Sequence, residues 1–71
     1  MKKLNTRILT KREHEIFLLL ISNNTTKDIA DKLNISEKTV RNHISNVIQK
    51  LDVNGRAAAV VELLRLKEIE L

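Results

Sequence analysis

Residues 35–51, ISEKTVRNHISNVIQKL, decide the fold of this 71-residue chain because they combine a helix start with two chemically different faces. Ser36 is a typical N-cap, since its hydroxyl can accept a hydrogen bond from a backbone N–H of the first turn. Four aliphatic residues then recur at intervals of three or four, which is the spacing of one buried helical stripe. That stripe consists of Val40, Ile44, Val47 and Leu51.

The opposite side of this predicted helix carries side chains that all donate hydrogen bonds and none that is negatively charged. Such a face suits an anionic partner that offers hydrogen-bond acceptors. Glu37 in the first turn would repel a phosphate unless it pairs with a base of this protein, although its place near the helix N-terminus is favourable. His43 lies beside the buried stripe, where we expect packing with a polar tip. The donors are Lys38, Arg41, Asn42, Ser45 and Gln49.

The length and composition of the chain limit the classes of protein to which it can belong. A chain of 71 residues makes one small domain with a marginal core, which a partner subunit would help to stabilise. There is no cysteine, and the two histidines lack a ligand spacing, so the sequence indicates neither disulfides nor a metal site. No apolar run approaches the ~18 residues of a membrane span, and no signal-peptide pattern is visible. We therefore expect a cytoplasmic protein.

The net charge of +4 is weak evidence for a nucleic-acid partner because of where the charges lie. Residues 1–12 contain five bases and no acid, whereas residues 13–52 contain five bases and six acids. Residues 53–71 hold three of each. The excess charge therefore belongs to the N-terminal arm and the start of the first helix, and nucleic-acid binding must be argued from individual cations.

Residues 1–8 are expected to form a flexible arm, and residues 9–71 the folded domain. Within that domain, the first helix has residues suited to capping at each end. Thr10 and Glu13 have the spacing of a capping box, in which the side chain of each residue accepts a hydrogen bond from the backbone N–H of the other. The helix ends near Asn24, which can take the left-handed conformation of a helix end.

Two further helices complete an all-α chain with short connections. Thr25 caps a second helix that ends near Leu33, and residues 52–55 connect the third helix to a fourth at about 56–68. The absence of proline and the helical spacing of apolar residues indicate an all-α fold. Residues 67–71 are expected to fray.

The fourth helix has more apolar surface than so small a core needs. One apolar stripe is needed to pack against the core. The second stripe would remain exposed, and exposed apolar surface of this kind is common at interfaces. We expect the second stripe to form a homodimer, with tolerated exposure as the alternative. The first stripe is Ala59, Val60, Leu63 and Leu66, and the second is Ala57, Val61 and Leu64.

The spacing between residues 26 and 46 fits a helix-turn-helix motif. It combines a short scaffold helix, a tight turn and a longer helix that begins at a capping serine. Ala30 is small enough to let two helices cross closely. In this geometry the N-terminal half of the second helix enters the major groove of DNA. An ordinary helical hairpin is the alternative that the pattern leaves open.

Five short segments and one arginine carry a resemblance to a known family. They are LTKRE (9–13), EIF (15–17), TKDIA (26–30), ISEKTVRNHIS (35–45) and KLDV (50–53), followed by Arg56. Over about residues 8–68 the chain thereby resembles the LuxR/FixJ-type DNA-binding domain, and especially members that stand alone without a receiver or ligand-sensing domain. The resemblance implies four helices, a DNA-binding dimer and regulation of transcription. Asn24, Asp52 and Gly55 depart from the common residues, and all three affect caps or turns.

The resemblance also implies roles for individual residues. Arg41, Asn42 and Ser45 match base-facing positions, and the fourth helix matches the dimerisation element. Arg41 can pair with the O6 and N7 atoms of guanine, and Asn42 with the N6 and N7 atoms of adenine. The residues that match or suit phosphate contacts are Thr26, Lys27, Lys38 and Thr39, with Lys50 added on its charge alone.

We therefore expect a dimeric, sequence-specific regulator of transcription that binds double-stranded DNA, with RNA polymerase as a further partner and neither cofactor nor small-molecule ligand. The initial methionine favours a complete chain. The alternatives are the C-terminal output domain of a response regulator, a helical protein-docking module, and a DNA-binding module of the sigma-factor type. An enzyme is not expected, because the sequence contains no nucleophile–base arrangement and no glycine-rich phosphate loop.

Overall fold

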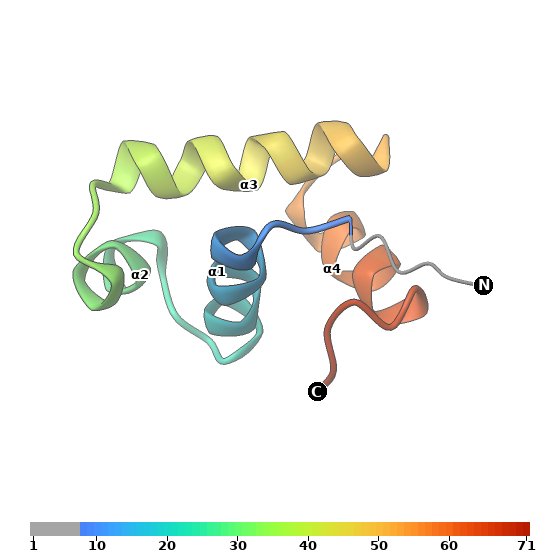
Figure 1. Ribbon diagram of the computed structural model, residues 1–71, viewed down its shortest axis with the longest axis horizontal. Helices are drawn as coiled ribbons and strands as arrows, with labels where there is room; N and C mark the ends of the chain where they lie inside the picture. The colour runs from blue at the N-terminus through green and yellow to red at the C-terminus, as the bar shows by residue number, and fades with distance from the viewer. Residues whose placement is uncertain (1–7) are drawn as a thin grey trace.

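The computed structural model describes residues 8–71, which form four α-helices joined by short turns (Figure 1). The all-α, four-helix architecture predicted from the sequence is confirmed. Residues 1–7, which make up most of the expected arm, lie outside the described part. In chain order the helices are α1 (Lys11–Ile21), α2 (Thr26–Leu33), α3 (Glu37–Leu51) and α4 (Arg56–Arg65).

α3 is the axis of the fold, because the other three helices all pack against it. It runs along one side of the molecule, with α2 near its start, α1 across its middle and α4 near its end (Figure 1). The turn between α2 and α3 therefore lies at one end of the molecule, and α4 lies at the other.

The core fills the space between α3 and the helices that cross it. Val40, Ile44 and Val47 are buried as predicted, whereas Leu51 at the helix end is only partly buried. Phe17, the sole aromatic residue, is fully buried. Burial of each large apolar side chain contributes ~1.5–3 kcal/mol, which explains how so short a chain holds four helices together. The remaining core residues are Leu9, Ile16, Ile29, Ala30, Ala59, Leu63 and Ile69.

Side-chain hydrogen bonds cap the N-termini of the first three helices at the residues that the sequence predicts. Thr10 accepts the Glu13 N–H at 3.1 Å, and the Glu13 carboxylate accepts the Thr10 N–H at 2.9 Å, which completes a capping box. Thr25 and Asp28 form the same pair of bonds at 3.0 Å each. The Ser36 hydroxyl accepts an N–H from the first turn of α3 at 3.0 Å. These local bonds set where each helix starts.

Each helix end is followed by a non-glycine residue in the left-handed conformation. The sequence places this conformation at Asn24 after α1, but Asn23 adopts it, because α1 ends at Ile21 and the turn closes one residue sooner. The Asn24 side chain completes the turn instead, since its Nδ2 donates to the Leu19 carbonyl at 2.9 Å. The left-handed residues and their φ angles are Asn23 (67°), Asn34 (59°), Asp52 (56°) and Lys67 (61°).

The chain after α4 folds back onto the core, so the expectation that residues 67–71 fray is wrong for Ile69, while Glu70 and Leu71 are exposed. α4 ends at Arg65, three residues earlier than expected, because Lys67 turns left-handed and its N–H bonds a carbonyl of the last helical turn. The chain then returns along the domain, and Ile69 becomes 2% exposed within the core. Ile69 therefore attaches the end of the chain to the core by an apolar contact.

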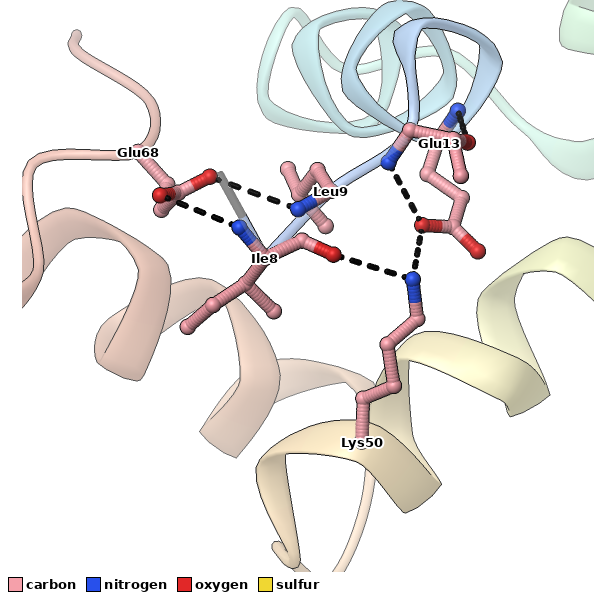
Figure 2. Close-up of polar contacts among 6 residues, drawn as sticks. Ile8, Leu9, Glu13, Lys50 and Glu68 are labelled. Carbon is pink, nitrogen blue, oxygen red and sulfur yellow. Dashed lines mark hydrogen bonds and ion pairs between the residues drawn. The ribbon is translucent and has the colours of Figure 1, made fainter. Parts of the chain in front are cut away.

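The segment that enters α1, Ile8-Leu9, lies between the end of α3 and the turn that follows α4 (Figure 2). The Glu68 carboxylate accepts the backbone N–H groups of Ile8 and Leu9, each at 3.4 Å. Leu9 is buried in the core. This entry segment is therefore attached to the domain by both a polar and an apolar contact.

Candidate nucleic-acid interface

The outward face of α3 presents the three residues that the sequence predicts as base readers. Arg41, Asn42 and Ser45 are all exposed, because the buried stripe through Val40 and Ile44 turns the opposite side of the helix to solvent. A guanidinium, an amide and a hydroxyl therefore project from one surface. Together they offer the donors and acceptors that base edges require.

The turn between α2 and α3 determines how this face is presented. Asn34 adopts the left-handed conformation, and the Ile35 N–H donates to the Ala30 carbonyl at 3.0 Å. Ile35 packs against the core, and Ala30 is buried where α2 meets α3. The turn thus has the helix-turn-helix geometry that the sequence predicts, with α2 as scaffold and α3 as the presented helix.

The start of α3 offers hydrogen-bond donors next to the helix N-terminus. Lys38 is exposed and Thr39 is half-buried. The Ser36 hydroxyl donates to Thr39 Oγ1 at 2.9 Å, so the hydrogen of the Thr39 hydroxyl is free to point elsewhere. The positive end of the helix dipole adds to these donors, and this arrangement favours an anion such as a phosphate.

The start of α2 presents a second group of candidate phosphate contacts at the same end of the molecule. Lys27 is exposed in the first turn, and Thr26 beside it is half-buried. Asp28 lies in the same turn, where hydrogen bonds from Thr25 hold the pKa of its carboxyl below its usual range, assisted by the charges of Lys32 and Lys27. The Asp28 carboxylate is therefore committed to the capping box, and Lys27 remains exposed to solvent.

Glu37 has the partner that its position on this face requires. Its Oε1 lies 3.6 Å from Nη1 of Arg41, one helical turn further along α3. The Arg41 and Glu37 side chains are 56% and 47% exposed, so the pair lies in solvent. The expected favourable position near the helix N-terminus also holds, since Glu37 is the first residue of α3.

Lys50 lies away from the start of α3 and makes contacts that the sequence does not predict (Figure 2). Its Nζ donates to Glu13 Oε1 at 2.5 Å and to the carbonyl of Ile8 at 3.0 Å. Burial by itself would raise the pKa of Glu13, but the bond from Lys50 and the N–H of Thr10 outweigh burial and lower it. A phosphate contact of Lys50 stays a prediction, and it would compete with this intramolecular cluster.

The outer side of α4 carries the apolar surface that the sequence assigns to a dimer. Ala57 is exposed and Val61 is 63% exposed, whereas Leu64 is half-buried and packs partly on the core. The core stripe is shorter than expected. Leu66 is 40% exposed because α4 ends at Arg65 and the chain turns away at that point.

Residues 8–71 offer neither a metal-binding cluster nor a membrane-spanning helix. Within that range no group of three or more His, Cys, Asp and Glu side chains could hold a metal ion. Over the same residues no helix is both long enough and apolar enough to cross a membrane. His43, expected to pack with a polar tip, is half-buried beside the core stripe of α3.

Comparison with known sequences identifies relatives of the whole domain. Residues 7–63 match the family described as bacterial regulatory proteins, luxR family. The chain is 67% identical over 64 residues to the spore germination protein GerE of Bacillus subtilis (strain 168), covering 90% of this chain and 86% of that protein. It is 48% identical over 58 residues to the transcriptional regulatory protein DegU of Brevibacillus brevis. That match covers 82% of this chain but 25% of DegU.

Solved structures agree with this fold. The structure of the transcription factor GerE superposes with a TM-score of 0.89 at 62% identity, covering 92% of this chain and 97% of that one. The response regulator ChrA of a heme-sensing two-component system superposes with a TM-score of 0.81 at 34% identity. That match covers 96% of this chain and 33% of ChrA. Both confirm the predicted arrangement of four helices around a helix-turn-helix motif.

Proposed function

Because this chain belongs to the LuxR family of bacterial regulatory proteins, we propose that it binds double-stranded DNA by placing α3 in the major groove. As a GerE-like member of that family, it is a DNA-binding regulator of transcription and not an enzyme. The observation that supports the proposed groove contact is the outward face of α3. Its residues Arg41, Asn42 and Ser45 are all exposed and lie outside the buried stripe.

We assign sequence recognition to these three residues. Arg41 offers two parallel donors to the O6 and N7 atoms of guanine, and Asn42 offers one donor and one acceptor to adenine. The Ser45 hydroxyl can either donate or accept a hydrogen bond, and it contacts the base pair next to the one that Arg41 reads. Four phosphate contacts would set the register of α3 in the groove without carrying sequence information. They are Thr26 and Lys27 at the start of α2, and Lys38 and Thr39 at the start of α3.

The functional unit that we propose is a two-fold dimer through α4, in the bacterial cytoplasm where it would also meet RNA polymerase. The exposed side chains of Ala57 and Val61, with the edge of Leu64, would face the same residues of a second copy. Two copies of α3 would then read half-sites about one DNA turn, roughly 34–36 Å, apart. One short helix buries little area, so the dimer would be weak without DNA.

Selection of bound sites from random duplex DNA tests this proposal. The expected result is a symmetric site with two half-sites. In the Arg41→Ala variant, the binding free energy should become less favourable by about 1–3 kcal/mol. The variant should also lose its base preference at one position of each half-site. A variant with unchanged affinity and unchanged base preference would refute the assignment of Arg41. Failure of the wild-type protein to enrich any sequence would refute sequence-specific recognition.

A further inference from the structure

Glu37 is the only acidic residue of α3, and it lies on the face proposed to meet DNA. The first acids of α1 and α2, Glu13 and Asp28, accept backbone N–H groups in capping boxes. Glu37 does not, because Ser36 caps α3 on its own and the third helical residue is a threonine. Within residues 8–71 the Glu37 carboxylate forms an ion pair with Arg41, whose Nη1 lies 3.6 Å from Oε1. Its role is therefore not explained by the start of the helix alone.

The pair changes what Arg41 offers to DNA. Binding to any DNA sequence depends on cations that neutralise phosphates, and each such cation adds to affinity and to salt dependence. An arginine that faces a carboxylate one turn away is partly neutralised and attracts phosphates less. A guanine still offers Arg41 two aligned acceptors, which a correctly placed helix can reach. Because the guanidinium has five N–H donors, it can contact a guanine edge while it stays paired with Glu37, whereas a phosphate at the same guanidinium would also lie beside the Glu37 charge. The carboxylate therefore weakens binding to arbitrary sequences more than binding to the correct site.

We propose that Glu37 is a specificity-determining residue that acts through Arg41. Its charge repels a phosphate from the guanidinium, and it stays paired with Arg41 while the guanidinium contacts a guanine. Specificity is the difference between two affinities, and it rises when binding to wrong sequences is weakened. This inference rests on the proposed function, because it requires Arg41 to read a base.

The test compares Glu37→Gln with a control of equal charge change. Glu15→Gln removes one negative charge from an exposed pair with Arg12, whose atoms lie 3.3 Å apart on α1. Dissociation constants are measured for a selected site and for a scrambled duplex, over a range of salt concentrations. Relative to the control, Glu37→Gln should bind the scrambled duplex about three- to tenfold more tightly, with a salt slope steeper by about 0.9. Affinity for the selected site should change by less than about twofold, because the pair is present both in the free protein and in the complex in which Arg41 contacts guanine.

A second variant separates action through Arg41 from simple repulsion of DNA. In an Arg41→Ala background, Glu37→Gln should have no effect beyond that of Glu15→Gln in the same background. If the gain in binding to scrambled DNA persists without Arg41, Glu37 acts on DNA directly and the inference is overturned. Equal specificity ratios for Glu37→Gln and Glu15→Gln would overturn it as well.

Thermal unfolding of each variant supplies the structural control, since a role confined to the helix N-terminus would move stability and leave the specificity ratio unchanged. Failure of this inference is distinguishable from failure of the proposed function. If wild-type protein does not distinguish the selected from the scrambled duplex, the proposed function fails and the inference fails with it. If it does, and Arg41→Ala loses that preference while Glu37→Gln retains it, only the inference fails.

Discussion

Lys50 and Glu13, which are 37 residues apart in the sequence, form an ion pair that joins the end of α3 to the start of α1 (Figure 2). Their Nζ and Oε1 atoms lie 2.5 Å apart, and the Glu13 side chain is 5% exposed. The same carboxylate accepts the N–H of Thr10, and the same ammonium donates to the carbonyl of Ile8. One buried carboxylate therefore serves both a helix cap and a contact between helices.

Stability should fall in acid partly because of Glu13. Its pKa is lowered in the folded protein, so its contribution is present above the pKa of the unfolded chain, about 4.3, and is lost as the pH falls through the folded value. At pH 7, Glu13→Gln should lose about 1–3 kcal/mol, the typical contribution of a hydrogen bond to a charged group. Urea unfolding between pH 7 and pH 3 should show the unfolding free energies of the wild type and of Glu13→Gln converging as the pH falls. A constant difference across that range would contradict this assignment.

Lys50 and Lys27 should respond differently to removal of their charge. Lys50 is bonded within the protein, whereas Lys27 is exposed at the start of α2. In DNA binding, Lys27→Ala should reduce the slope of log affinity against log salt by about 0.9, the value for one phosphate contact. Lys50→Ala should leave the slope at the wild-type value and lower stability instead. Equal slopes for the two variants would assign Lys50 to a phosphate.

The chain end should contribute measurably to stability through Ile69. This side chain is fully buried, whereas Leu71 is 93% exposed. Ile69→Ala should lower the free energy of unfolding by about 2–4 kcal/mol, because it removes core contacts and leaves a cavity. Leu71→Ala is the control and should stay within about 0.5 kcal/mol of wild type. Similar values for both variants in urea unfolding would show that the chain end is not part of the core.

The left-handed turn after α3 should be improved by glycine. Asp52 has a φ of 56°, and its carboxylate lies at the negative end of the helix dipole. Asp52→Gly should raise the unfolding free energy by about 0.5–1 kcal/mol, because glycine adopts this conformation without a steric penalty. Asp52→Ala removes the same charge but not the strain, so it should be less stable than Asp52→Gly. Equal thermal stability of the two variants would attribute the effect to charge alone.

Val61 is the residue of choice for testing the dimer, because it is far more exposed than Leu64 and its substitution should spare the core. Val61→Glu should lower the dimer fraction in sedimentation equilibrium. Affinity for a site with two half-sites should fall about tenfold or more, while affinity for a single half-site stays unchanged. Leu71→Glu makes the same chemical change at the exposed chain end and should affect neither. A folded Val61→Glu protein with the wild-type dimer fraction would exclude Val61 from the interface.

Features that depend on neighbours along the chain could be predicted from the sequence. The caps at Thr10, Thr25 and Ser36 depend on residues three positions away, and all three are confirmed. The outward face of α3 followed from its buried stripe, since the two are opposite sides of one helix. The four helices and the spacing of the helix-turn-helix motif were predictable for the same reason, whereas the family followed from the resemblance of whole sequence segments.

Features that depend on distant residues were missed. Ile69 is a lone apolar residue among charged neighbours, and no periodicity marks it as core. The pairing of Lys50 with Glu13 has no local pattern either, because it exists only once α3 has packed on α1. The left-handed residue after α1 was misplaced by one position, since both Asn23 and Asn24 tolerate that conformation.

The hydrogen bonds that the Glu68 carboxylate accepts from Ile8 and Leu9 join residues about 60 positions apart, and so nearly close the described chain into a ring. A domain of this kind suits circular permutation, in which a short linker joins the old ends and new ends open at an exposed turn. Opening residues 8–71 within the connection at 52–55 would make α4 the first helix and α3 the last. We expect such a permutant to fold, because α1, α2 and α4 would still pack against α3 although their order along the chain had changed.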